Sequence, residues 1–118
     1  MNYINLTGHE IHELATDKVI PTNADKLTVS SSAMKVAEYD GMTVEVVNNI
    51  LQGKIPEPKE DTIYIVNQLV LGMMPSDRID IIAPKRVIRW NKSDVDKGLC
   101  TESQVGAVKG CIGFRAKE

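Results

Sequence analysis

KVAEYDGMTVEVV, residues 35–47, contains the clearest hairpin signal in the chain. Its centre, Asp40-Gly41, is a pair suited to a tight turn with positive φ. The runs on both sides are rich in β-branched or aromatic residues, which favour extended strands. The stretch therefore predicts a β-hairpin.

Short extended segments occur on both sides of this hairpin. Their β-branched content, or their alternation of polar and apolar residues, predicts strands at 3–7, 9–14, 19–20, 26–30, 61–66, 79–83 and 86–90 and within 105–114. Three consecutive serines follow Val29, at residues 30–32, and a polar edge strand or turn explains them better than a phosphate cradle.

One short helix is predicted at residues 67–74, where Pro75 ends it. Val66, Leu69, Val70 and Met73 fall at helical spacing on one face, which predicts that they pack in the core. Residues 91–104 are polar and are expected to be irregular. The fold class predicted is α+β, a small predominantly antiparallel β domain with one short helix.

Length and composition favour an ordinary globular protein. The chain has 118 residues, 42% of them hydrophobic and 25% charged, which fits a single domain spanning 1–118. We expect no signal peptide and no membrane span, and hence a location in the cytoplasm. Cys100 and Cys111 are too few for a disulfide framework and are expected to be reduced.

Positive charge is concentrated in one stretch of an acidic chain. Between Arg78 and Lys92, five basic residues stand against Asp80 alone, so this stretch carries +4 and leaves −6 for the remainder of a chain whose net charge is −2. A confined positive patch suits a small anion better than duplex DNA, which favours proteins with a broad basic surface.

No catalytic motif is present. His9 and His12 have acidic neighbours, but residues three apart on a strand point to opposite faces, and no zinc-enzyme spacing occurs. The chain also lacks GxSxG, a Walker loop and GxGxxG. We therefore predict no enzyme activity, no catalytic residues, no metal and no cofactor.

The basic stretch has two interpretations. If residues 86–91 are extended, Val87, Arg89 and Asn91 share one face, and Arg89 with Asn91 and Lys92 could form a nucleotide clamp. The alternative is that the cations are solvated strand residues paired with the acids of the chain, and that Trp90 is an ordinary core residue.

Several motifs resemble a family of small phage proteins, the Thoeris anti-defence sponges. These proteins usually begin Asn-Leu-Thr-Pro-His, continue through Thr-Ile-Tyr-Ile-Val to an Ala-Pro and a Val-Arg pair, and end in Gly-Cys-x-Gly. The corresponding segments in this chain are NLTGH at 5–9, IPEP at 55–58, TIYIV at 62–66, DIIAP at 80–84, VIR at 87–89 and GCIGF at 110–114.

The resemblance implies a protein that sequesters a cyclic ADP-ribose isomer made by a TIR-domain sensor, without cleaving it. It implies pockets at the interface of a homodimer or higher homo-oligomer, and other cyclic nucleotides stay open as ligands. The lack of a long apolar run and the confined positive patch predict no membrane and no nucleic-acid partner. Arg89, Asn91 and Lys92 would then engage phosphate or ribose. The full set of candidate ligand-binding residues is Arg78, Ile82, Arg86, Arg89, Trp90, Asn91, Lys92, Lys109 and Arg115.

The chain departs from the family pattern at three places. Gly8 replaces the usual Pro. Ile82 stands where an aromatic residue is common, so a ligand base would be held there by apolar contact, or would stack on Trp90. The segment at 91–105 is longer than in many relatives and forms either a lid or a surface loop. A second function also stays open, that of a phage interaction module whose basic strand binds an acidic protein or nucleic acid.

Overall fold

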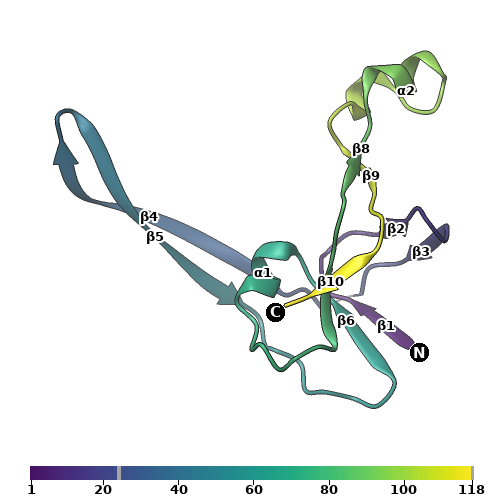
Figure 1. The fold of residues 1–118 in the computed structure, drawn as a ribbon, viewed down its shortest axis with the longest axis horizontal. Helices are drawn as coiled ribbons and strands as arrows, with labels where there is room; N and C mark the ends of the chain where they lie inside the picture. The colour runs from purple at the N-terminus through teal and green to yellow at the C-terminus, as the bar shows by residue number, and fades with distance from the viewer. Residues whose placement is uncertain (24, 118) are drawn as a thin grey trace.

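A four-stranded mixed sheet forms the centre of the fold in the computed structural model, which describes residues 1–23 and 25–117. Its strands, hydrogen-bonded in the order β1-β6-β7-β10, are β1 (Asn2–Asn5), β6 (Thr62–Ile65), β7 (Ile81–Pro84) and β10 (Phe114–Ala116). β6 pairs in parallel with both β1 and β7, and β10 pairs antiparallel with β7 (Figure 1).

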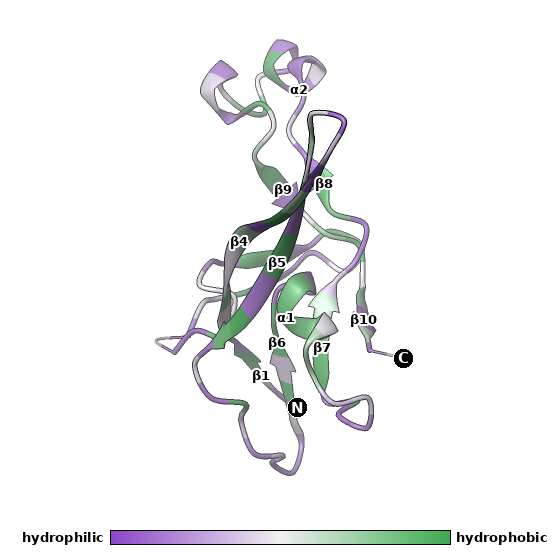
Figure 2. Cartoon of the chain, turned by 90° about the vertical axis from the view of Figure 1, so that its left-hand side faces the viewer, coloured by the Kyte–Doolittle hydropathy of each residue, from purple (hydrophilic) through white to green (hydrophobic). Residues whose placement is uncertain are grey.

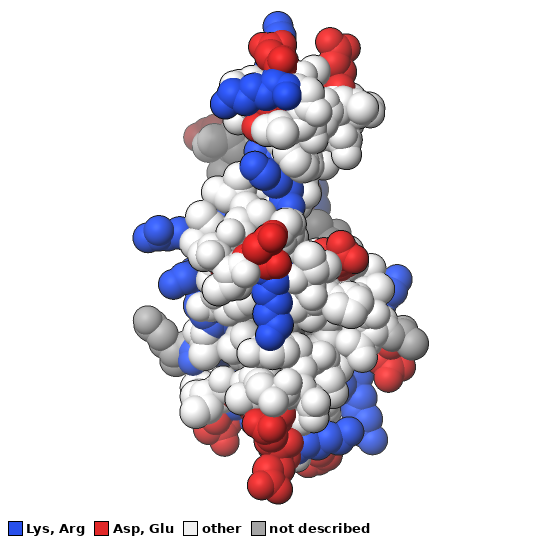
Figure 3. All heavy atoms as spheres, turned by 90° about the vertical axis from the view of Figure 1, so that its right-hand side faces the viewer, with Lys and Arg blue, Asp and Glu red and all other residues white. Residues whose placement is uncertain are grey.

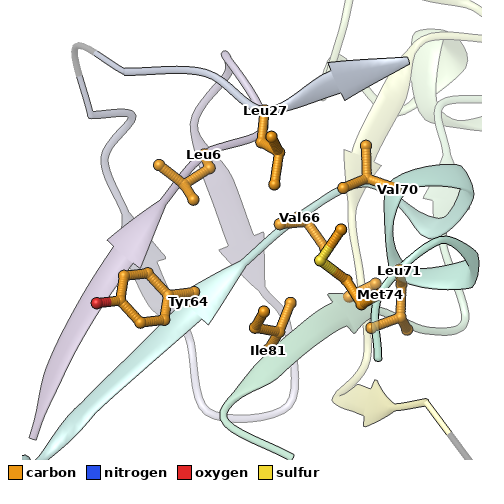
Figure 4. Close-up of a cluster of buried hydrophobic side chains, with 9 residues drawn as sticks. Leu6, Leu27, Tyr64, Val66, Val70, Leu71, Met74 and Ile81 are labelled. Carbon is orange, nitrogen blue, oxygen red and sulfur yellow. The ribbon is translucent and has the colours of Figure 1, made fainter. Parts of the chain in front are cut away.

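The main core lies against this sheet (Figure 4). Tyr64 and Val66 come from β6 and the residue after it, and Leu6 and Leu27 approach from the N-terminal segments. Tyr64 is 2% exposed, and its hydroxyl donates a hydrogen bond to the Glu57 carbonyl at 2.8 Å, so its polar end is satisfied inside the core.

Helix α1 (Gln68–Gly72) confirms the helix predicted after β6, but its buried face differs from the prediction. Val70, Leu71 and Met74 are buried, whereas Leu69 and Met73 are exposed. The predicted core packing is therefore confirmed for Val66 and Val70 and wrong for Leu69 and Met73. Asn67 has extended backbone angles, so Val66 lies before the helix and does not set the helical phase that the prediction assumed.

Two antiparallel hairpins leave this body. The first joins β2 (Ile11–Glu13) to β3 (Lys18–Ile20), where strands were predicted at 9–14 and 19–20. Its Ile11 and Ile20 pack with Ile65 and Cys111 in a second, smaller core.

The second hairpin is the one predicted around Asp40-Gly41. It joins β4 (Thr28–Tyr39) to β5 (Met42–Gln52), and both turn residues have positive φ, 51° and 79°, as a two-residue hairpin turn requires. Ser30 and Ser31 lie in β4 and hydrogen-bond across to β5, which confirms the polar-strand interpretation. The ribbon extends far beyond the body (Figure 1).

A third projection differs from the sequence prediction. Strands β8 (Ile88–Arg89) and β9 (Val108–Gly110) lead to a small head, residues 91–107, that holds α2 (Lys92–Asp96) and the 3-10 turn η1 (Glu102–Gln104). The head was expected to be irregular, and a second helix was not predicted.

The predicted strand at 86–90 was also wrong in extent. Arg86 has a φ of 48°, and a register shift falls between Ile88 and Arg89, so regular alternation does not extend over 86–91. Val87 and Arg89 nevertheless line the same groove, whereas Asn91 caps α2. The α+β class with mostly antiparallel strands is nevertheless confirmed. No helix among residues 1–23 and 25–117 is long and apolar enough to cross a membrane.

Candidate ligand-binding groove

A groove of about 520 Å³ lies between the start of β2, the start of α1 and the β8–β9 pair. Its polar lining is supplied by His9, Glu10, His12, Asn67, Gln68, Arg89 and Lys109. Ile11, Pro84, Val87 and Val108 provide apolar surface. This mixture of apolar walls and a few polar groups is typical of a site for a small organic ligand.

The first wall is fixed by a buried asparagine. Asn5 is fully buried, and its side-chain amide donates to the carbonyls of His9 at 2.8 Å and Ile20 at 3.3 Å. Its side-chain oxygen accepts from both the amide and the hydroxyl of Thr7. The NLTGH motif is therefore a hydrogen-bonded turn that holds His9 at the groove.

The second wall depends on a close backbone approach at Gly110. A Cβ at this position would lie 2.5 Å from the His12 carbonyl oxygen, so only glycine fits. The neighbouring Cys111 amide donates to that same carbonyl at 2.9 Å, and the Cys111 carbonyl accepts from Leu14. Glycine at 110 thus lets the end of β9 lie directly against β2.

Glu13 links the same two segments from the other side of β2. Its carboxylate accepts from the Gly113 amide at 2.6 Å and from the Thr16 amide at 2.7 Å. These hydrogen bonds, that from Gly113 first, lower the pKa of Glu13 because they stabilise the charged form. The GCIG motif at 110–113 is thereby explained as a structural junction.

Arg89 and Lys109 meet at the groove because β8 pairs with β9. Arg89 is exposed and donates from Nη1 to the Gly106 carbonyl at 2.9 Å, which leaves other guanidinium donors available. Lys109 places its Nζ 5.0 Å from the centre of the Trp90 ring. Trp90 is half-buried beside the cations and is absent from both described core clusters, so the core interpretation of this residue does not hold.

The remaining predicted residues are dispersed. Asn91 is the N-cap of α2, where its side-chain oxygen accepts from the Asp94 amide at 2.9 Å, and Lys92 is the first residue of that helix. Arg86 is an exposed residue outside the groove lining. Arg115 donates to the Gln68 side chain at the groove edge.

Arg78 and Ile82 also lie away from the groove. Arg78 forms a bidentate pair with Asp80 at 2.9 and 3.0 Å, and these hydrogen bonds lower the pKa of Asp80 and raise that of Arg78. Ile82 lines a second, more open hollow of about 760 Å³, together with Tyr3 and Phe114. Lys18 in that hollow has its Nζ 4.0 Å from the Tyr3 ring centre.

Sequence reasoning missed the groove residues His9, His12, Asn67 and Gln68. The histidines were considered only as metal ligands, and no group of three or more His, Cys, Asp or Glu residues suited to a metal occurs in the described part of the chain. Gln68 is held by Pro84 and Arg115, whereas the Asn67 side chain makes no capping bond to α1. Asn67 is thus available to a ligand.

Cys111 lines the groove without being a reactive thiol. It is 2% exposed and packs with Ile11, Ile20 and Ile65. Burial raises the pKa of the thiol, and the negative charge of Glu13 acts in the same direction. A neutral packing role follows at ordinary pH.

Comparison with protein-family models, with curated proteins and with solved structures finds no match for this chain.

Proposed function

We propose that the chain is a nucleotide sponge that binds a cyclic ADP-ribose isomer in the groove and sequesters it without cleaving it. The observation that carries this proposal is the meeting of Arg89 and Lys109, from two strands, at a groove of about 520 Å³. Two cations that line one groove suit a pyrophosphate, and the volume suits a ligand of nucleotide size.

The surroundings of the two cations support the same ligand class. Trp90 is not among the residues that line the groove, but its ring lies beside Lys109, which does, and offers a flat surface to a nucleobase that extends past this cation. Asn67 brings both a donor and an acceptor, which suits a ribose hydroxyl or a base edge. The resemblance of NLTGH and GCIG to the phage sponges adds the biological role, which is protection of a phage inside its bacterial host.

The charge distribution favours a small ligand over nucleic acid. On the face shown in Figure 3, basic and acidic side chains are interspersed and do not form one basic surface. A protein that binds nucleic acid without sequence preference needs a continuous basic track along the phosphate backbone.

The test combines binding with recovery of the ligand. Purified protein is mixed with cyclic ADP-ribose isomers, and its melting temperature is measured by thermal shift. The protein is then denatured by heat, and the mass of the released compound is measured by mass spectrometry. We expect a rise in melting temperature and recovery of the intact ligand.

Variants connect that result to the groove. Changing Arg89→Ala together with Lys109→Ala should abolish the thermal shift, because both phosphate-binding cations are lost. Arg86→Ala with Lys92→Ala is the matched control, since it removes two cations of the same region from outside the groove lining. Equal losses from both pairs would contradict the assignment of the site.

Two other outcomes would replace the proposal. Recovery of a hydrolysed product would indicate an enzyme, and His9 and His12 would then be the first residues to substitute. Salt-dependent binding to oligonucleotides, without a response to cyclic nucleotides, would favour the interaction module.

A further inference from the structure

The β4–β5 ribbon, which we call the arm, has two chemically different faces. Cross-strand partners share a face, so the register assigns each residue to one side. Along the distal half, one face carries only apolar side chains: Met34, Ala37, Tyr39, Met42, Val44 and Val46. We call this the apolar face of the arm.

The opposite face is polar at its distal end and anchored at its base. It carries Lys35 and Glu38, which form an ion pair at 2.5 Å, and also Glu45. Residues three apart on a regular strand would point apart, so this pair requires the register shift between Lys35 and Ala37. Nearer the body, Val29 and Leu51 on this face pack against the main core.

The apolar face of the arm is not covered by any described part of the chain. Met34, Tyr39 and Met42 are 63%, 64% and 64% exposed, and Val44 and Val46 remain 41% and 46% exposed. Figure 2 shows hydrophobic stretches alternating with polar ones along the projecting ribbon. An isolated two-stranded ribbon of this kind is marginally stable in water and needs a further layer.

The molecule exposes more surface than a compact chain of its mass, because the arm and the head project from the body. It exposes 8023 Å², whereas a compact chain of 13.0 kDa exposes about 6,300 Å². Its radius of gyration is 17.6 Å, against about 13.5 Å for a compact chain of 118 residues. The excess of about 1,700 Å² is larger than the ~800 Å² that one partner loses in an interface of standard size.

We propose that the apolar face of the arm packs against the same face of a second copy of this chain, related by a two-fold axis. The face carries no charge, so two copies meet without like-charge repulsion, and the ion-paired face stays in water. A second copy also supplies an apolar face of equal length. The product is a sandwich of two ribbons, about 10 Å apart.

This pairing goes beyond ligand binding and is tested without a ligand. The mass of the wild-type protein is measured by light scattering after gel filtration, at loading concentrations from micromolar to about 100 µM. We expect a dimer or an even-numbered assembly. A mass of 13.0 kDa at every concentration would overturn the proposal.

Two single substitutions at neighbouring positions in β5 test whether the apolar face, and not the strand as a whole, mediates assembly. Val44→Lys places a charge on the apolar face, and Thr43→Lys places the same charge on the opposite face, across from Glu38. We expect Val44→Lys to shift the mass to that of one chain, or to half that of a larger assembly, and Thr43→Lys to leave it unchanged. Loss of assembly in both, or in neither, overturns the proposal.

Two further measurements distinguish loss of assembly from misfolding, and a second copy from a membrane as the partner of the apolar face. The thermal unfolding temperature of each variant is compared at a concentration at which wild type is monomeric, and equal values show that the body is intact. Flotation of wild type with phospholipid vesicles, combined with a monomeric mass in their absence, would assign the face to a membrane and overturn the pairing.

Discussion

The body and its projections are stabilised in different ways. In the body, side chains such as Ile65, Val66 and Ile81 are completely buried, and buried polar groups such as Asn5 are satisfied within it. No residue of the arm strands is fully buried, and neither is any residue of α2 or η1. The body thus depends on tertiary packing, and the projections depend on turn chemistry and helix caps.

This contrast assigns different tasks to the two regions. The groove is formed where the head's stalk meets the body, so its geometry depends on buried junctions at Asn5, Glu13 and Gly110. The arm presents apolar surface that the body does not use. Substitutions in the body should therefore change stability and binding together, whereas those in the arm should change assembly alone.

The largest effect is expected for Asn5→Ala. It removes the Asn5 side-chain partner of the Ile20 carbonyl and of the Thr7 amide, and each unsatisfied buried group costs roughly 1–3 kcal/mol. The Thr7 hydroxyl and the His9 carbonyl keep the hydrogen bond of 3.0 Å that joins them. We expect a loss of about 3 kcal/mol or more, measured by urea unfolding. Asn49→Ala on the arm is the matched control, since it removes an exposed hydrogen bond from Ser31 and should cost no more than about 0.5 kcal/mol. Equal losses would refute the contrast.

Gly110→Ala should have the next largest effect. The new Cβ would stand 2.5 Å from the His12 carbonyl oxygen, so β2 and β9 must separate, at a cost of about 1–3 kcal/mol. We expect a lower melting temperature and weaker binding of the cyclic nucleotide, both read in one thermal-shift experiment.

Gly72→Ala is the control for that substitution. Nothing lies within 4 Å of a Cβ at Gly72, and alanine favours the helix end. Its melting temperature should stay the same or rise slightly. A similar fall in both variants would mean that close approach at Gly110 does not determine the groove.

Local signals explain which parts of the fold were predictable. The Asp40-Gly41 turn is determined by two residues, and the strand TIYI by its β-branched and aromatic content. The second helix was missed although Asn91 and Asp94 have the spacing of a capping box, which the sequence contains.

Non-local contacts explain what could not be predicted. Arg89 and Lys109 were both named as candidates, but only the β8–β9 pairing brings them together. The bond from Gly113 to Glu13 spans 100 residues, and no local pattern indicates it. His9 was discounted because strand spacing separates it from His12, whereas in the structure the buried Asn5 amide places it at the groove.

Glu13→Gln tests the junction through its pH dependence. The pKa of Glu13 is lowered in the folded state, so the stability that it supplies is present above its unfolded pKa of about 4.3 and is lost as the pH falls through the lower folded value. We expect Glu13→Gln to be less stable than wild type at pH 7, with the difference shrinking below about pH 4.

Urea midpoints of both proteins between about pH 7 and pH 2 measure this difference. Glu45→Gln removes one charge from the arm and serves as the control. A Glu13→Gln difference that stays constant over the whole range would show that the ionised carboxylate is not what stabilises the junction.

The smallest effect is expected in the head, where Asn91→Ala removes the N-cap of α2 at a cost of about 1 kcal/mol. Because the head has little packing with the body, hydrogen exchange of the α2 amides should accelerate about fivefold while the global urea midpoint stays unchanged. Asn91→Ser keeps a capping oxygen and should restore slow exchange. Nucleotide binding should be equal in both variants, because the Asn91 side chain, which was predicted to contact the ligand, is hydrogen-bonded to Asp94. If Asn91→Ser lost binding while its cap stayed intact, Asn91 would belong to the ligand site, and the head would have to fold over the groove.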